Sequence, residues 1–305
     1  MEIAILVIYN LIFFWRAWLG PLDFARSELL STFFPSWIWQ GREWCKWRIP
    51  RYEPYFWLNA HAHPVLSTYY PFHLLSSVFS NFVGLDTAFK ILVYQILAHY
   101  IFASFGWFLV ISFWASPLIA LFGAITLTYS AYNIKQQPCI VYTIAWFPWL
   151  LFGVATNNIL VSSISLGMIF LAGYYPLGIQ IGLISALASL LWNSNILGFL
   201  WIPLGIAVGL PQLIPFVKYL PKTIRTKKAE SIEVGFWEKT WYIGLPAIFL
   251  IPFSTSRIWP LAILSALLVL GLFKNYLPRI PYRWLFTFQF SIGWMALSGL
   301  SNIGF

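Results

Sequence analysis

Apolar runs about as long as a membrane-spanning helix recur along the whole chain, with short polar segments between them. A helix needs about 20 mostly apolar residues to cross the hydrocarbon core of a bilayer. Trp and Tyr crowd the ends of these runs, as expected at membrane interfaces. The pattern predicts an all-α fold, a polytopic transmembrane helical bundle of about ten spans. The predicted spans are Ile3–Leu19, Phe89–Phe113, Pro117–Ala131, Cys139–Val154, Asn158–Ala172, Leu177–Trp192, Ile196–Val217, Trp241–Phe253, Trp259–Phe273 and Trp284–Ser301.

The segment Pro21–Pro71 is the longest part of the chain outside the predicted spans. Loops this long are usually functional or disordered, and its many aromatic residues argue against disorder. Asp23–Gln40 has the pattern of an amphipathic helix in the membrane interface, broken near Pro35. Phe72–Val83 would be only about 18 Å long as a helix, so we expect a re-entrant or interfacial helix. The bundle therefore has a long, partly helical first extramembrane loop.

These elements divide the chain into three parts. Residues 1–217 form a membrane core that includes the loop 21–71, residues 218–240 form a basic polar loop, and residues 241–305 form C-terminal transmembrane helices. The chain stops at Phe305, just after an apolar run and without a polar tail. This ending is typical of a truncated product or of the membrane core of a longer protein.

Composition and charge narrow the function. The chain is 60% hydrophobic and 9% charged, whereas about 25% charge is typical of soluble domains. A soluble nucleic-acid-binding protein is therefore excluded despite the net charge of +9. With the spans above, every Lys and Arg except Arg257 and every Asp and Glu except Glu2 falls on one face. We expect chemistry at that face, and its cations favour a lipid-phosphate substrate.

Four ordered sets of residues carry a resemblance to a known family. They are Pro21-Leu-Asp-Phe-Ala-Arg26 with Phe33-Phe34-Pro35 and Gln40-Gly41; His63-Pro-Val-Leu-Ser-Thr-Tyr-Tyr-Pro-Phe-His-Leu-Leu75; Ser130-Ala-Tyr-Asn-Ile-Lys-Gln-Gln137 with Ala145-Trp-Phe-Pro-Trp149; and Gly173-Tyr-Tyr-Pro176 and Gln180 with Gly209-Leu-Pro-Gln-Leu-Ile-Pro215. We call them the first to fourth motifs. In order and spacing they resemble the GT-C superfamily of polytopic glycosyltransferases, most closely its YfhO-like bacterial membrane proteins.

The resemblance implies an enzyme that moves a sugar from a polyprenyl-phosphate carrier to a cell-envelope acceptor. Such a reaction needs a base near the acceptor hydroxyl and cations on the leaving phosphate. Asp23, just beyond the first span where the family has its loop carboxylate, is the expected catalytic base. The alternative is that Asp23 caps the following helix.

Further polar and aromatic residues on the charged face are candidates for substrate binding: Arg26, Glu28, His61, His63, Tyr70, Lys135, Gln136, Tyr175, Lys222 and Arg225. Most have a structural alternative. Glu28 is solvated or forms an ion pair, the histidines and tyrosines pack at the interface, and Lys135, Lys222 and Arg225 contact lipid headgroups.

Cofactor signals are weak in this sequence. No nucleotide-binding motif is present, so we expect no nucleotide. The spacing of His61 and His63 is too loose to predict a metal site, although a divalent cation stays an open alternative. His99 and Gln95 lie inside a predicted span, where buried polar groups are costly, so we expect an interhelical hydrogen bond or a wet cavity there.

The sequence leaves two other functions open. A lipid or glycan transporter or flippase would carry related broken helices in two halves, and none is evident. A non-catalytic membrane scaffold that retains the fold would bind the lipid-linked donor without consuming it. We expect a multi-pass protein of the plasma (inner) membrane. The resemblance puts the charged face outside the cytoplasm, whereas the positive-inside rule favours the cytoplasm.

Overall fold

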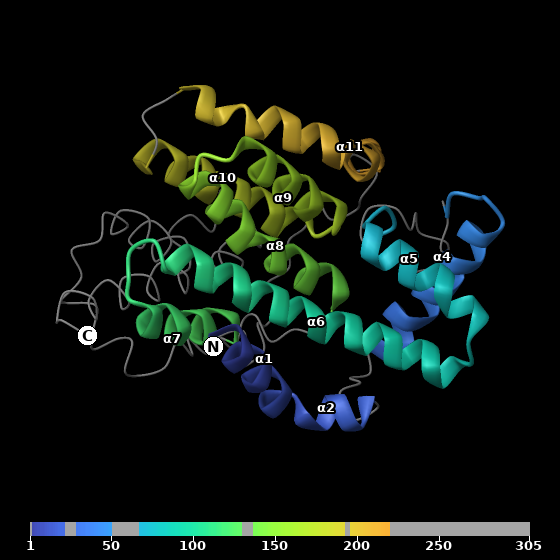
Figure 1. The fold of residues 1–305 in the computed structure, drawn as a ribbon. Coiled ribbons are helices and arrows are strands. Elements are labelled where there is room, and N and C mark those ends of the chain that lie inside the picture. The colour runs from blue at the N-terminus through green and yellow to red at the C-terminus, as the bar shows by residue number, and fades with distance from the viewer. Residues whose placement is uncertain (1, 22–28, 51–66, 130–136, 193–195, 220–305) are drawn as a thin grey trace, which may run out of the picture. The chain divides into compact units, whose positions relative to one another are not determined.

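The computed structural model describes residues 2–21, 29–50, 67–129, 137–192 and 196–219, and every regular element within these ranges is a helix. The elements are α1 (Glu2–Phe13), α2 (Trp15–Leu19), the π-helical turn η1 (Leu29–Phe33), α4 (Phe34–Cys45), α5 (Pro71–Phe79), the 3₁₀ turn η2 (Ser80–Phe82), α6 (Leu85–Ile111), α7 (Pro117–Thr128), α8 (Pro138–Ala155), α9 (Ile159–Leu171), α10 (Tyr175–Trp192), η3 (Ile196–Phe199) and α11 (Trp201–Tyr219) (Figure 1). The predicted all-α fold is confirmed for these residues.

Three described helices are long and apolar enough to cross a membrane: α6, α8 and the segment Trp201–Lys218 of α11. The apolar helices α1, α7 and α9 are shorter than a full span. The boundaries of α8, α9 and α10 agree with the predicted spans to within two residues. The predicted spans beyond residue 219 lie outside the described residues.

The predicted interfacial helix differs in its extent from the helix observed. Residues 22–28 lie outside the described part, and a regular α-helix begins at Phe34 after the π-helical turn η1. Pro35 is in the first turn of α4, where its missing N–H is not needed, so it starts the helix. The helix then runs to Cys45, five residues beyond the expected end at Gln40.

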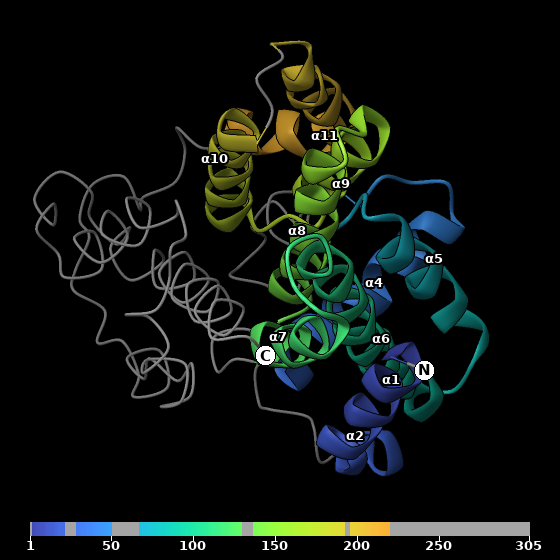
Figure 2. The same cartoon turned by 60° about the vertical axis from the view of Figure 1, so that its left-hand side comes forward.

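The chain forms two compact units. The larger comprises Val7–Ala103 and Lys135–Thr223, and within it α9 packs against both α8 and α11 while α4 packs against α5 (Figures 1 and 2). The second unit includes the described residues 2–6 and 104–129. Its described helical residues belong to the start of α1, the end of α6 and α7.

Glycines bring α9 and α11 close together in the larger unit. A Cβ atom added at Gly205 of α11 would lie 2.7 Å from Cβ of Leu166 on α9. One added at Gly209 would lie 2.7 Å from Cβ of Phe170, one turn further along both helices. Close approach through small residues is the usual way in which helices associate in lipid, where no hydrophobic force drives them together.

The contact between α4 and α5 also depends on a glycine. A Cβ atom at Gly41 of α4 would collide with the backbone carbonyl of Ser77 on α5. Nearby, the buried indole of Trp37 donates a hydrogen bond from Nε1 to the carbonyl oxygen of His73, at 3.3 Å. The two short helices are therefore fixed to each other by backbone contacts that leave no room for a larger side chain.

We predict that Gly41→Ala destabilises the protein. The added methyl group collides with the backbone carbonyl group of Ser77, which cannot move aside as a flexible side chain can, and overpacking of this kind costs about 1–3 kcal/mol. Gly182→Ala in α10 is the control, because its added Cβ meets only Leu166 Cδ1 at 3.7 Å and gains helix propensity. Thermal unfolding in one detergent checks both variants, and equal melting temperatures would contradict the prediction.

Candidate functional site

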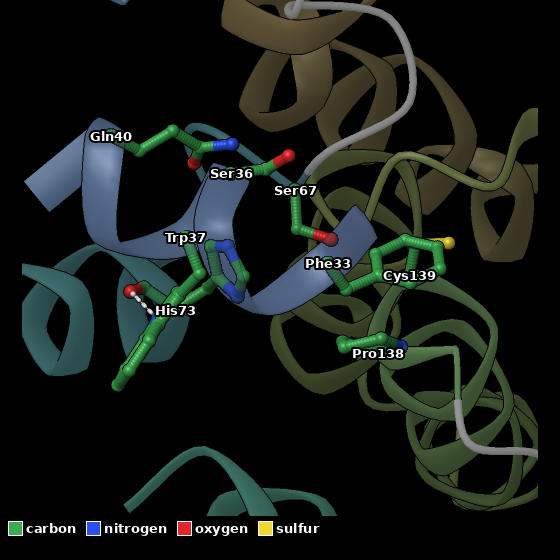
Figure 3. Close-up of a pocket in the computed structure, with 8 residues that line it drawn as sticks. All are labelled: Phe33, Ser36, Trp37, Gln40, Ser67, His73, Pro138 and Cys139. Carbon is green, nitrogen blue, oxygen red and sulfur yellow. Dashed lines mark hydrogen bonds between the residues drawn. The ribbon is translucent and has the colours of Figure 1, made fainter. Parts of the chain in front are cut away.

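A narrow pocket in the larger unit is lined by residues of three of the four motifs or their immediate neighbours. Its lining residues are Phe33, Ser36, Trp37, Gln40, Ser67, His73, Pro138 and Cys139 (Figure 3). Phe33 and Gln40 belong to the first motif, and Ser67 and His73 to the second. Pro138 follows the last residue of the third motif's first half, Gln137.

Tyr70 of the second motif is the centre of the polar network beside this pocket. Its side chain is fully buried, and its hydroxyl lies 2.7 Å from Nε2 of His99 on α6. The indole Nε1 of Trp146 on α8 donates to the same hydroxyl at 2.8 Å. Tyr70 thereby connects the start of α5 to α6 and α8.

The protons in this network follow from its geometry. Nδ1 of His99 lies 2.7 Å from the carbonyl oxygen of Gln95, which can only accept, so Nδ1 carries the proton. Nε2 of the neutral ring is then an acceptor, and the Tyr70 hydroxyl donates to it. Burial raises the pKa of Tyr70 far above its usual value despite the hydrogen bond from Trp146, so the hydroxyl stays protonated. Every group in this network therefore has a fixed role as donor or acceptor.

The expectation for the polar residues inside the second span is confirmed. His99 bonds to Tyr70, which precedes α5, and the hydroxyl of Ser76 on α5 donates to Oε1 of Gln95 on α6. The ring of Tyr142 on α8 stacks on Tyr70 with centroids 4.8 Å apart. Hydrogen bonds and ring contacts thus join α5, α6 and α8 in one buried cluster.

His73 connects the cluster to the pocket. Its ring is buried against Trp37 and Tyr142, and within the described residues Nδ1 has no hydrogen-bond partner. Burial, with a smaller effect from His99, lowers the pKa of His73 to about 3. The imidazole is therefore neutral at physiological pH and presents a polar atom in the lining of the pocket (Figure 3).

The fourth motif is bound to the second by hydrogen bonds between segments far apart in sequence. The Ser67 hydroxyl donates to the carbonyl oxygen of Ala172, directly before Gly173, at 2.6 Å. The backbone N–H of Tyr69 donates to Oε1 of Gln212 at 3.3 Å. The Tyr175 hydroxyl donates to the carbonyl oxygen of Gln212 at 2.7 Å. Gln212 thus contacts Tyr69 of the second motif through its side chain. It contacts Tyr175, in the first half of the fourth motif, through its backbone.

The two sequence-predicted site residues that the structure describes are in the core. Tyr70 and Tyr175 are both buried, and Tyr175 stacks on Phe216 with centroids 3.8 Å apart. Neither ring has a face open to a sugar in this structure, because the aromatic neighbours and hydrogen bonds described above surround them. Both residues instead join helices within the core.

The other predicted site residues lie outside the described part of the chain: Asp23, Arg26, Glu28, His61, His63, Lys135, Gln136, Lys222 and Arg225. Trp146 and Gln212 belong to the third and fourth motifs, but the sequence alone assigned no individual role to them or to Trp37, since only their partners in space reveal these roles. Among the described residues no group of three or more His, Cys, Asp or Glu could hold a metal ion.

Comparison of the chain with protein-family models, with curated proteins and with solved structures finds no match.

We predict that Tyr70→Phe destabilises the protein by about 1–3 kcal/mol, because His99 Nε2 and Trp146 Nε1 each lose a buried partner. Tyr94→Phe is the control, because the half-buried Tyr94 makes one hydrogen bond, to the carbonyl oxygen of Trp18. Chemical or thermal unfolding in detergent compares the two. An equal loss of stability in both variants would show that the buried network contributes no more than the single hydrogen bond of Tyr94.

We also predict that His73 makes the fold sensitive to acid. In the unfolded chain this side chain takes up a proton as the pH falls below its ordinary pKa of 6.5, whereas the folded chain resists protonation down to about pH 3. Stability contributed by the neutral ring is therefore present above pH 6.5 and is lost progressively between pH 6.5 and 3. The slope reaches at most about 1.4 kcal/mol per pH unit.

His73→Phe keeps a ring in the same place and removes the titration. Melting temperatures measured across this pH window should fall less steeply for the variant than for the parent protein. Parallel curves would exclude His73 as a source of the acid sensitivity.

Proposed function

We propose that this protein is a membrane glycosyltransferase that transfers a sugar from a polyprenyl-phosphate carrier to a cell-envelope glycan or lipid acceptor. The convergence of the motifs that resemble the GT-C superfamily is the observation that carries the proposal. Ser67 bonds to a residue 105 positions away, and Tyr69 bonds to one 143 positions away. Segments far apart in the sequence therefore contact one another beside the pocket.

Chain connectivity limits how far two of the substrate-binding candidates can lie from the pocket. Gln136 is two residues before Pro138 of the pocket, a distance of at most about 7 Å along the backbone. His63 is four residues before Ser67, at most about 14 Å along the chain. These short separations support a role for both residues near the pocket. The pocket itself is too narrow for a sugar ring. We therefore propose that the sugar binds next to the pocket and not inside it.

The proposed reaction uses these residues in defined roles. The Asp23 carboxylate takes the proton of the acceptor hydroxyl while that oxygen forms a bond to the anomeric carbon of the sugar. The bond from this carbon to the carrier phosphate breaks, and the phosphate leaves with the electron pair. Arg26 can hold the phosphate through a two-pronged contact, and Lys135, Lys222 and Arg225 add positive charge. Glu28, His61 and His63 complete the polar surroundings of the sugar.

The membrane setting fits this chemistry. About ten spans, of which three described helices have the required length and composition, would provide an apolar surface for the prenyl chain. We place the charged face outside the cytoplasm at the plasma (inner) membrane, where cell-envelope acceptors are found. A divalent cation could assist on the donor phosphate, and the reaction needs no nucleotide.

Turnover of a polyprenyl-phosphate-linked sugar by the purified protein in lipid nanodiscs tests the proposal. Asp23→Asn should lower turnover by about 10²-fold or more while donor binding persists. Glu43→Gln is the matched control in the same predicted loop. The Glu43 carboxylate forms an ion pair with Lys46 at 3.4 Å and has no proposed role in transfer, so this variant should keep full turnover.

Three outcomes would contradict the proposal in different ways. Full turnover by Asp23→Asn would remove Asp23 from the mechanism. Donor binding without consumption by the parent protein would favour a scaffold, and movement of the donor across the bilayer without transfer would favour a flippase.

A further inference from the structure

The ends of α4 and α8 close in the same way but carry different residues. After α4, the N–H of Trp47 donates to the carbonyl oxygen of Trp44 and that of Arg48 to Glu43, both at 2.9 Å. After α8, Asn157 donates to Val154 and Asn158 to Gly153, at 3.1 and 2.8 Å. Both closures put one residue in the left-handed region, Trp47 at φ 56° and Asn157 at φ 52°.

Trp is a poor residue for this position. Gly fits it without strain and Asn tolerates it, whereas the Cβ atom of a bulky residue is crowded by the backbone. Asn157 follows this rule and Trp47 breaks it. Since the turn itself would be better served by Gly or Asn, the indole of Trp47 needs another explanation.

Packing does not supply that explanation. Trp47 is 96% exposed, the highest value among the large apolar side chains of the described residues. Its ring therefore gains nothing from burial that could offset the strained backbone. A large apolar side chain held in solvent at a strained turn is typical of a residue that contacts something beyond the folded chain.

Exposed basic residues lie close to Trp47 in the sequence. Arg42, Lys46 and Arg48 all lie on the surface, and Ile49 adds a further exposed apolar side chain. Lys46 pairs with Glu43, while Arg42 and Arg48 form no ion pair with any residue whose position is described. The end of α4 thus combines an indole with two guanidinium groups available to an anion. We call Arg42, Trp47 and Arg48 the α4 tip.

The helix packed against α4 points to lipid as the partner. Phe72, Leu75, Phe79 and Phe82 recur at spacings of three and four residues along α5 and η2, and each is more than half exposed. This spacing puts them on one face. An outward apolar face on a helix too short to span a bilayer suits the boundary between acyl chains and headgroups.

We propose that the α4 tip docks on anionic lipid headgroups and holds the α4–α5 pair at the membrane surface. Trp prefers the interfacial layer, with its ring among the headgroups and its N–H near water. Arg42 and Arg48 pair with lipid phosphates, which adds selectivity for anionic membranes. This anchoring role goes beyond glycosyl transfer and does not depend on it.

The native Cys45, exposed and two residues before Trp47, provides the probe. A nitroxide spin label on Cys45 of the full chain reports contact with oxygen, which concentrates in lipid, and with a water-soluble nickel chelate. Cys139 is buried, and a Cys45→Ser variant measures any background labelling. The comparison uses nanodiscs of anionic or zwitterionic lipid, and detergent micelles.

We expect the label to shift toward oxygen and away from nickel in anionic nanodiscs, with a smaller shift in zwitterionic ones. Trp47→Gly should abolish the shift and also raise the melting temperature in detergent, since Gly relieves the strained turn. The double variant Arg42→Gln with Arg48→Gln should remove the preference for anionic lipid. Asn157→Gly, the same change at the matching turn, should leave the label unaffected.

Several results would overturn the proposal. One is a label equally exposed to the nickel chelate in all three environments. Another is a lipid-dependent shift that survives Trp47→Gly. A third is shielding in detergent that grows with protein concentration, because it would assign the tip to a second copy of the chain. Reversal of the shift by inorganic phosphate alone would indicate a site for free anions instead.

Discussion

The hydroxyl of Tyr70 has to be satisfied in an apolar interior, and the packing around the candidate site follows from that requirement. A buried hydroxyl without partners costs several times what a single hydrogen bond contributes to stability, and this cost is greatest where water is excluded. Here the hydroxyl donates to His99 and accepts from Trp146. Because its partners lie on α6 and α8, the start of α5 can occupy one position only. His73, which is in α5 and lines the pocket, is therefore also held in place.

The same principle links the second and fourth motifs. Gln212 lies in α11 between two prolines, Pro211 and Pro215, each of which lacks the N–H that a helix interior normally uses. The side-chain oxygen of Gln212 accepts a hydrogen bond from the backbone N–H of Tyr69, and its backbone carbonyl oxygen accepts one from the Tyr175 hydroxyl. Two polar groups of Gln212 are thus satisfied away from water. The glycines between α9 and α11 permit this arrangement, since they let α11 approach closely. Motifs that look like separate helix ends in the sequence therefore act as one connected frame.

The sequence predicted the elements better than the contacts. The limits of α8 and α9 followed from apolar runs bounded by Pro138 and Asn158, and Asn158 does cap α9 by accepting from the N–H of Val161. The burial of His99 followed from its place inside a span. The partnership of Tyr70 with Trp146, 76 residues away, could not be predicted, because periodicity assigns a residue to a face and never to a partner. The extension of α4 to Cys45 was missed because Gly41 and the charged residues Arg42 and Glu43 interrupt the apolar pattern after Gln40.

Trp47 and Tyr70 show that a membrane protein meets two solvents with opposite demands. In the core, polar atoms must find partners within the chain, and Tyr70 does so through neighbours on separate helices. At the interfacial layer, an indole is stabilised because both water and hydrocarbon are present. The exposed Trp47, which has a strained backbone, would gain this stabilisation by entering the layer. The α4–α5 pair contains both situations within one short segment, since Trp37 is buried on the side of α4 that faces α5 while Trp47 projects at its end. A segment fixed on one side by the core and on the other by headgroups keeps the pocket at a constant depth. In the glycosyl transfer proposed above, the phosphate of the lipid carrier would then meet the site at that depth without a rearrangement of the chain.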